Sequence, residues 1–273
     1  MQAYAHISTI METVALHAQE IGDSGQPLII LHGLFGSGDN WRTLGMKWAE
    51  KYRVFLVDQR NHGRSPHHNE WTYEAMAADL ERFIRERNIE RPLVLGHSMG
   101  GKTVMEMAAR AEVDLCGIVV ADMAPVQYSP HHTEILKALN SVDLSTVDKR
   151  EEVDEALKPD IPEFLIRQFL LKGLLRTAEG EYRWKFNLEV ITSQYDGILS
   201  EVAQGALVDM PALFIYGGKS PYVNEEGRQV IEQKFSQAEF HCIEEASHWL
   251  HAEAPQVFYR EVSRYLENYC AYA

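Results

Sequence analysis

The chain has 273 residues, 45% hydrophobic and 24% charged, a composition that supports one large globular core with room for an inserted subdomain. Its formal net charge of -14 at pH 7 argues against a nucleic-acid or anionic-membrane partner, because a polyanion is repelled at long range. No apolar stretch reaches the roughly 18 residues of a membrane span, and residues 1–12 lack the basic start and apolar block of a signal peptide. We therefore expect no membrane span and a cytoplasmic location.

The first part of the chain alternates between strand-like and helix-like segments. After an expected edge strand near the N-terminus, residues 27–31 (PLIIL) and 53–57 (RVFLV) are compact apolar runs typical of buried strands. Asp39 and Asn40 offer an N-cap for a helix between these two runs. Thr72 is predicted to cap the next helix, in which apolar residues recur at helical spacing.

The same alternation continues further along the chain. Short apolar runs predict strands at residues 92–95, 117–121, 212–216 and 238–243. Two longer segments predict helices, at residues 102–111 and 255–269. This order predicts an α/β fold with a mainly parallel, doubly wound sheet covered by helices on both faces. Active groups in such sheets collect at the carboxyl ends of the strands.

Residues 126–208 interrupt the alternation because they are mostly helical in character. Within them, residues 163–176 (EFLIRQFLLKGLLR) are apolar around much of a helical circumference. We expect a helical cap inserted after the strand that ends at Asp122, with residues 1–125 and 209–273 forming the core. The apolar surface of the cap either lines a pocket for a hydrophobic group or packs on the body of the protein.

The pentapeptide GHSMG at residues 96–100 is the most informative motif. It has the form G-x-S-x-G and stands between a strand-like and a helix-like run, so the chain must reverse at Ser98. We expect a strained backbone at Ser98, with Gly96 and Gly100 at positions where the strand and the helix come too close for a side chain. Ser98 is therefore the candidate nucleophile.

A serine nucleophile needs a base, and position selects His248 among twelve histidines. His248 follows the last predicted strand in a loop that leads to the final helix, and His251 is the second choice. We expect the histidines of polar loops to be solvated, namely His67, His68, His131 and His132. No H-E-x-x-H or C-x-x-C spacing is present, so neither a metal site nor any other cofactor is expected.

The acid that orients the base is the harder assignment. The strand at residues 212–216 is followed by GGKSP, which has Ser220 but no carboxylate before Glu225. Asp122 stands at the carboxyl end of the strand after the nucleophile strand and is the better candidate, the alternative being that it caps a turn. The remaining alternatives are less favoured and comprise Glu225, Glu244 and Glu245.

An oxyanion forms when the nucleophile attacks a carbonyl, and two backbone donors are expected to receive it. The first is the amide of Met99, directly after the nucleophile at a helix N-terminus. The second is expected in the glycine-rich turn HGLFG at residues 32–36, from Leu34 or alternatively from Phe35. This turn lacks the G-K-[ST] ending of a phosphate-binding loop.

Taken together, these motifs resemble the α/β-hydrolase superfamily and, within it, the YbfF-type esterases. The resemblance spans nearly the whole chain, through HGLFGSGDNW (32–41), DQRNHGRSP (58–66), GHSMGGK (96–102), ADMAPV (121–126), GGKSPYV (217–223) and SHWLHAEAP (247–255). YbfF-type enzymes are similar to this chain in having a serine at the position of Ser220 and the acid in a D-x-A-P segment, which implies that Asp122 is the acid. The resemblance also implies a cofactor-free serine esterase that acts on short- to medium-chain acyl esters beneath a small helical cap.

The expected substrate is a small-molecule acyl ester or thioester, and the oligomeric state does not follow from the sequence. We expect aromatic and histidine side chains to line the pocket, namely Phe35, His97, Phe169, Trp184 and Trp249. An acyl-CoA thioesterase is the first alternative, because Arg167, Lys172 and Arg176, with Arg183 and Lys185, form a basic stretch in the expected cap. A carbon-carbon lyase of the menaquinone pathway and a non-catalytic ligand receptor on the same fold are more distant alternatives.

Overall fold

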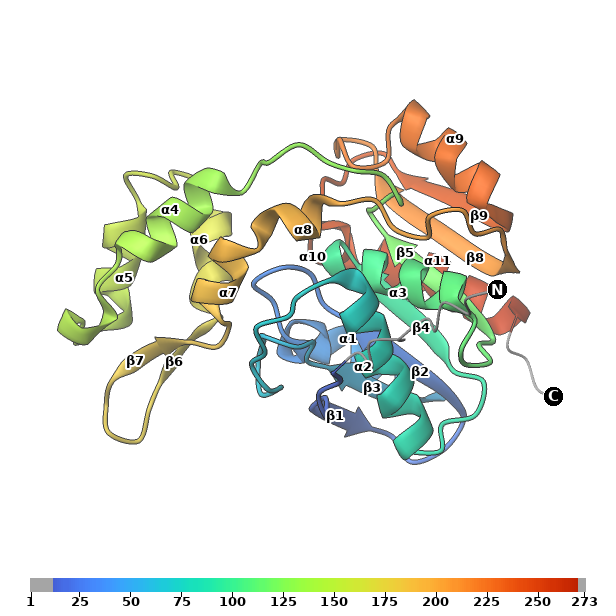
Figure 1. The fold of residues 1–273 in the computed structure, drawn as a ribbon, viewed down its shortest axis with the longest axis horizontal. Helices are drawn as coiled ribbons and strands as arrows, with labels where there is room; N and C mark the ends of the chain where they lie inside the picture. Colours follow the sequence, from blue (N-terminus) through green and yellow to red (C-terminus); the bar gives the residue numbers. More distant parts are fainter. Residues whose placement is uncertain (1–11, 270–273) are drawn as a thin grey trace, which may run out of the picture.

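The structure is a computed structural model that describes residues 12–269, so residues 1–11, to which most of the signal-peptide expectation refers, lie outside it. A seven-stranded sheet with the order β1-β3-β2-β4-β5-β8-β9 forms its centre (Figure 1). Strand β1 pairs antiparallel with β3, and every other neighbouring pair in this sheet is parallel. The predicted α/β fold with a mainly parallel sheet is confirmed.

Every predicted strand lies in this sheet. The strands are β1 (Ala18–Ile21), β2 (Gln26–Leu31), β3 (Tyr52–Val57), β4 (Leu93–His97), β5 (Gly117–Ala121), β8 (Val208–Gly217) and β9 (Phe235–Ile243). In β2 the side chains of Leu28 and Ile30 enter the apolar core on one face, and those of Ile29 and Leu31 enter the core on the other. Alternate residues thus face two buried layers, which explains why the strands are continuously apolar.

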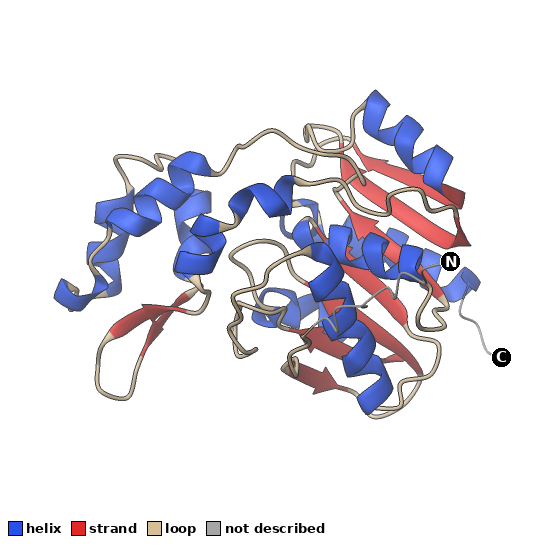
Figure 2. Cartoon of the chain, viewed as in Figure 1, coloured by secondary structure: helices blue, strands red, loops and turns tan. Residues whose placement is uncertain are grey.

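Helices cover both faces of the sheet, as Figure 2 shows. One layer contains α2 (Tyr73–Glu86), α3 (Met99–Arg110) and α9 (Glu225–Lys234), and the other contains η1 (Gly38–Trp41), α1 (Arg42–Trp48), α10 (Leu250–Glu253) and α11 (Pro255–Tyr269). The predicted cap of α2 is confirmed, because the hydroxyl of Thr72 accepts a hydrogen bond from the amide of Ala75 at 3.2 Å.

The helix after β2 begins differently from the prediction. Ser37, rather than Asp39 or Asn40, is the N-cap residue, and a short 3₁₀ helix precedes α1. The side chain of Asn40 accepts a hydrogen bond from the backbone amide of Ser37 at 2.7 Å, so Asn40 acts from inside the first turn.

An inserted segment leaves the sheet after β5 and returns at β8. It contains α4 (Thr133–Ser141), η2 (Leu144–Thr146), α5 (Arg150–Leu157), α6 (Phe164–Leu171), the hairpin β6 (Leu174–Arg176) and β7 (Tyr182–Trp184), α7 (Leu188–Ser193) and α8 (Tyr195–Leu199). Figure 1 shows α4 to α7 and the hairpin standing to one side of the sheet.

The hairpin corrects the prediction of one apolar helix over residues 163–176. Helix α6 ends at Leu171, and the chain turns at Gly173, whose amide bonds the carbonyl of Leu170 at 2.8 Å. A Cβ on Gly173 would lie 2.7 Å from the ring of Phe186, so this close approach requires glycine.

Lys102 of α3 joins both ends of the inserted segment to the core. Its ammonium donates hydrogen bonds to the carbonyls of Val126 at 2.8 Å, Leu199 at 3.3 Å and Ser200. The side chain is fully buried, and burial lowers its pKa to about 7. One side chain thus holds the exit and the return of the segment against the helix that follows Ser98.

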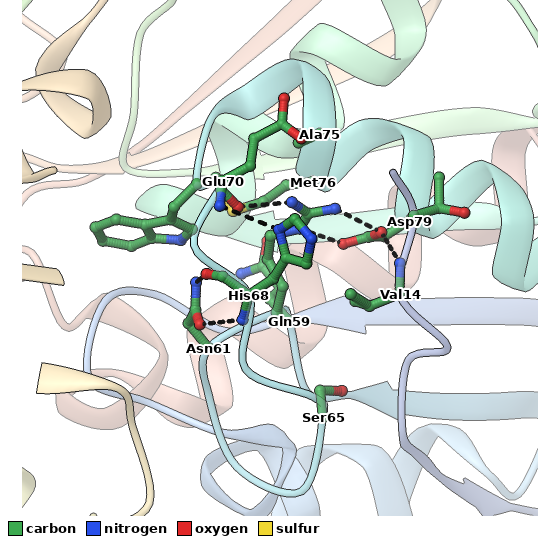
Figure 3. A network of polar contacts seen from close by, with 12 residues as sticks. Val14, Gln59, Asn61, Ser65, His68, Glu70, Ala75, Met76 and Asp79 are labelled. Carbon is green, nitrogen blue, oxygen red and sulfur yellow. Dashed lines mark hydrogen bonds and ion pairs between the residues drawn. The ribbon is translucent and has the colours of Figure 1, made fainter. Parts of the chain in front are cut away.

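The loop between β3 and α2 is held by a buried ion pair (Figure 3). The guanidinium of Arg60 donates to both carboxylate oxygens of Asp79, at 2.6 and 2.8 Å, and to the carbonyl of Glu70 at 2.7 Å. Asp79 also accepts from the amide of Val14 at 2.7 Å. Burial raises the pKa of Asp79, whereas the hydrogen bonds from Arg60 and Val14 oppose this shift and stabilise the buried carboxylate.

Candidate active site

The sheet order creates a crevice between β2 and β4. From β2 the chain moves to β3 on one side, whereas β4 lies on the other side of β2. Loops that leave such a switch point diverge, and ligands bind in the crevice between them. The loop after β2 carries His32 and Leu34, and the turn after β4 carries Ser98, so these residues meet at the carboxyl edge of the sheet.

Ser98 occupies the strained turn that its motif predicts. Its φ and ψ are 54° and -119°, and its amide bonds the carbonyl of Ala121 at 3.0 Å. A Cβ on Gly96 would lie 2.2 Å from the carbonyl oxygen of Gly100, and one on Gly100 would lie 2.7 Å from that of His32. The expected close approach of strand and helix is therefore confirmed.

Asp122 and His248 are in direct contact. The Nδ1–H of His248 donates to Oδ2 of Asp122 at 2.7 Å, and the amide of Gly217 donates to Oδ1 at 3.0 Å. The hydroxyl of Ser220 also donates to Oδ2. Asp122 is fully buried, and its φ is 52°, so it is a constrained residue whose carboxylate is fully engaged with donors. Its position is not that of a simple turn cap.

Two further histidines pack around His248. The Nε2–H of His97 donates to the backbone carbonyl of His248 at 2.9 Å and so holds the loop. Burial lowers the pKa of His97 well below its usual value and that of His251 to about 3. The ring of His251 stacks on Trp41 with centroids 4.4 Å apart, so it serves packing, and the structure gives it no carboxylate comparable to the one that His248 contacts.

The glycine-rich turn after β2 is held by Gln59. The amide of Gln59 donates to Nε2 of His32 at 3.0 Å, so the Nδ1–H of that ring donates to the carbonyl of Gly33 at 2.8 Å. Burial lowers the pKa of His32, which favours this neutral form. Phe35 has a φ of 61°, and both Leu34 and Phe35 line the cavity next to Ser98. Both remain candidates for the second oxyanion donor.

Two cavities meet at Ser98. We call them the front cavity, of about 50 Å³, and the rear chamber, of about 30 Å³. Ser98, Leu34 and His132 line both. The front cavity is also lined by His32, Phe35, His97, Ile135, Ile166, Phe169, Leu170, His248, Trp249 and His251. The rear chamber is also lined by Tyr73, Met99, Lys102, Met123, Tyr128, His131, Tyr195, Ile198, Leu199 and Tyr222.

Four of the five predicted pocket residues line the front cavity, namely Phe35, His97, Phe169 and Trp249. The fifth predicted residue, Trp184, does not line this cavity. It stacks on Phe186 with centroids 5.3 Å apart, and Phe186 in turn contacts Phe35 at 5.2 Å. The ring of Phe186 therefore stands between Trp184 and the cavity.

The sequence-based assignment missed the rear chamber. His132, which we expected to be solvated, lines both cavities, and burial lowers its pKa to about 3. The four tyrosines come from distant parts of the chain and carry no shared motif, although Tyr222 lies inside the GGKSPYV segment. Tyr222 stacks on His248 with centroids 4.1 Å apart.

Within residues 12–269, no group of three or more histidine, cysteine, aspartate or glutamate side chains is arranged to hold a metal ion. In the same part of the chain, no helix combines the length and the apolar character needed to cross a membrane.

Comparison with known proteins identifies the family. The sequence profile described as the alpha/beta hydrolase fold matches residues 26–255. The chain belongs to the α/β-hydrolase family. This α/β-hydrolase is 39% identical to Esterase YbfF of Escherichia coli (strain K12), over 90% of this chain and 94% of that protein, which places it among the YbfF-type esterases.

Two other relatives of this α/β-hydrolase agree with that placement. It is 35% identical to a mouse protein named sn-1-specific diacylglycerol lipase ABHD11, over 90% of this chain and 82% of the relative. A solved structure titled "Marine microorganism esterase" superimposes with a TM-score of 0.90 at 39% identity and covers 93% of this chain and 100% of its own.

Proposed function

We propose that this α/β-hydrolase is a cofactor-free serine carboxylesterase in which Ser98, His248 and Asp122 form the catalytic triad. The observation that carries the proposal is the hydrogen bond from His248 to the buried carboxylate of Asp122, on a ring that shares the front cavity with Ser98. The esterase and lipase names of the relatives support the same reaction class.

In the proposed mechanism, Ser98 attacks the acyl carbonyl while Nε2 of His248 takes the hydroxyl proton. Asp122 holds the ring in the tautomer that leaves Nε2 free to accept. The amides of Met99 and of Leu34, or alternatively Phe35, receive the oxyanion, each worth about 3 kcal/mol. His248 then gives its proton to the departing alcohol, and water cleaves the acyl-enzyme by the reverse sequence.

We assign residues 126–208 the role of a cap over the site, with residues 1–125 and 209–273 as the hydrolase core. Ile135, Ile166 and Phe169 of the inserted segment line the front cavity, which supports this division. The substrate class is a small-molecule ester with a short to medium acyl chain.

The structure corrects part of the argument for an acyl-CoA thioesterase. Arg167 is 5% exposed, and its guanidinium bonds Asp154 at 2.9 Å and the carbonyl of Ile161 at 2.9 Å. Lys185 forms an ion pair with Asp39 at 3.5 Å. The basic stretch therefore has less free charge for phosphates than the sequence suggests, which favours neutral esters.

The direct test is hydrolysis of p-nitrophenyl esters and matched acyl-CoA thioesters by the wild type and Ser98→Ala. We expect the wild type to hydrolyse esters and the variant to lose the activity, and a fluorophosphonate probe to label only the wild type. An unlabelled wild-type serine would instead support a receptor. If turnover of acyl-CoA exceeds that of the esters and falls steeply with salt, the thioesterase is the better assignment.

A further inference from the structure

The rear chamber has a lining that is polar by residue type. It includes Tyr73, Tyr128, Tyr195 and Tyr222, together with Lys102. Such a set is typical of a site for a charged or hydroxylated group, provided that its polar atoms are free to bind a ligand.

Two of the four tyrosine hydroxyls already have hydrogen-bond partners in the backbone. Tyr73 donates to the carbonyl of Ile198 at 2.9 Å. Tyr128 donates to the carbonyl of Tyr222 at 2.7 Å and accepts from the amide of Ala124 at 2.9 Å. Neither hydroxyl retains its proton for a substrate.

The other two hydroxyls are engaged by histidines. Tyr195 accepts from the amide of His132 at 3.0 Å and bonds Nδ1 of the same ring at 2.9 Å. Because burial lowers the pKa of His132 to about 3, its ring is neutral and Nδ1 can accept the tyrosine proton. Tyr222 bonds Nε2 of His131.

Lys102 is also saturated. Three backbone carbonyls, those of Val126, Leu199 and Ser200, lie within hydrogen-bond distance of its Nζ, so the protons of the amino group are directed at the backbone. Apart from Nε2–H of His132 and the nucleophile Ser98, what faces the chamber is mainly apolar, namely ring faces and the side chains of residues such as Met99 and Ile198. A carboxylate placed there would lose its hydration with too few donors to replace it.

The position of His248 orients the substrate between the two cavities. His248 lines the front cavity and is not among the described residues that line the rear chamber. The ring of Tyr222, which stacks on His248, lies between His248 and the rear chamber. The departing oxygen takes its proton from His248, so the alcohol must lie on the front side. Ser98 lines both cavities, so with the alcohol on the side of His248 the rear chamber is the space left for the acyl chain.

Resting on the proposed esterase function, we infer that the rear chamber is the acyl subsite and takes a short, uncharged acyl chain, while the alcohol occupies the front cavity. A volume of about 30 Å³ admits about two water molecules, comparable to a few methylene groups. The front cavity is larger and continues between apolar side chains of the inserted segment, so it tolerates a larger alcohol.

Two ester series measured on the wild type test this orientation. One varies the acyl chain from acetyl to decanoyl with a fixed alcohol, and the other varies the alcohol from ethyl to decyl with a fixed acetyl group. We expect kcat/KM to fall about 10-fold for each methylene beyond about four acyl carbons, and the fall along the alcohol series to begin later, beyond about six carbons, because the front cavity has the larger volume. A succinyl monoester is expected to react about 100-fold more slowly than the pentanoyl ester.

A matched pair of variants assigns the two cavities. Ile198→Ala removes an isoleucine from the rear chamber, and Ile166→Ala removes one from the front cavity. We expect Ile198→Ala to extend the accepted acyl chain by about two carbons without changing the alcohol profile, and Ile166→Ala to change only the alcohol profile.

The reverse assignment, with long acyl chains accepted and alcohols restricted, would overturn the inference while leaving the esterase function intact. So would an acyl limit that moves in Ile166→Ala rather than in Ile198→Ala. If the wild type shows no ester hydrolysis that depends on Ser98, the proposed function itself is rejected. If Ile198→Ala melts far below the wild type, the two wild-type series still decide the orientation.

Discussion

The hydroxyl of Ser220 donates a hydrogen bond to Oδ2 of Asp122, the same oxygen that accepts from Nδ1 of His248 at 2.7 Å. Ser220 follows β8, where the sequence has no carboxylate before Glu225. Here the carboxylate comes from the end of β5, and the serine after β8 fixes its direction. Residues that follow two adjacent strands, Asp122 after β5 and Ser220 after β8, thus form one hydrogen-bonded group with His248.

Replacing Ser220 tests this shared arrangement. We expect Ser220→Ala to lower kcat about 10-fold, because Asp122 loses one donor but keeps the amide of Gly217 and His248. Ser236→Ala is the matched control, since it removes a similar bond to Asp209 at 2.6 Å far from the site. Initial rates on a p-nitrophenyl ester measure both, and equal rates for the two variants would argue that Ser220 has no role in catalysis.

Asp122→Asn is expected to lower kcat by about 10³ to 10⁴, because an amide no longer holds His248 in the productive tautomer. Glu225→Gln is the control, because Glu225 is an alternative acid in the sequence and lies in the first turn of α9. Steady-state kinetics with circular dichroism spectra separate loss of activity from loss of fold. Near-normal turnover in Asp122→Asn would mean that another group orients the histidine.

Lys102 is expected to make the free energy of unfolding vary with pH above pH 7. Its pKa in the folded protein is about 7, below the ordinary value of 10.5, so between these pH values the unfolded chain binds a proton that the folded one does not. Its contribution to the free energy of unfolding therefore rises with pH in this window, by up to about 1.4 kcal/mol per pH unit.

Lys102→Met is the comparison, because it keeps the approximate length of the side chain but removes the titrating amino group and its hydrogen bonds. We expect it to lower the free energy of unfolding by about 2 to 4 kcal/mol and to abolish this part of the rise. Urea unfolding of both proteins at pH 7, 8 and 9 measures the difference. An equal pH slope in both would show that Lys102 stays charged in the folded state.

Buried histidines make the protein sensitive to acid. Burial lowers the pKa to about 3 for His62, His132 and His251, so below about pH 6.5 the unfolded chain binds protons that the folded protein does not. Stability contributed by these rings is complete above that pH and is lost as the pH falls toward 3. We expect the free energy of unfolding to fall by up to about 1.4 kcal/mol per pH unit for each histidine.

His62→Asn tests one of these rings, because its amide can replace the bond from Nδ1 to the carbonyl of Arg60 at 3.0 Å. We expect the variant to show a shallower loss of stability between pH 6 and pH 4 than the wild type. Urea unfolding at pH 6, 5 and 4 provides the measurement. A steeper slope in His62→Asn would contradict a neutral buried ring.

The local sequence was sufficient for features that depend on short segments. The glycines around Ser98 predict a strained turn because no side chain fits where strand meets helix, and Thr72 predicts a cap because its hydroxyl reaches an amide three residues on. It was insufficient where a feature depended on close packing. The chain turns at Gly173 after α6 ends at Leu171, and the close approach of Phe186 to this glycine is a contact that no local pattern reveals.

By itself, the sequence determined the alternation of strands and helices, the nucleophile turn and the candidates Asp122 and His248, because each stands at a recognisable place in an alternating α/β pattern. Only the tertiary structure decided which polar groups remain free. The tyrosines and Lys102 around the rear chamber look like binding groups in the sequence, yet their protons are taken by carbonyls and histidines from distant segments. Hydrogen-bond capacity is a property of residue type, but its use depends on partners that only folding brings together.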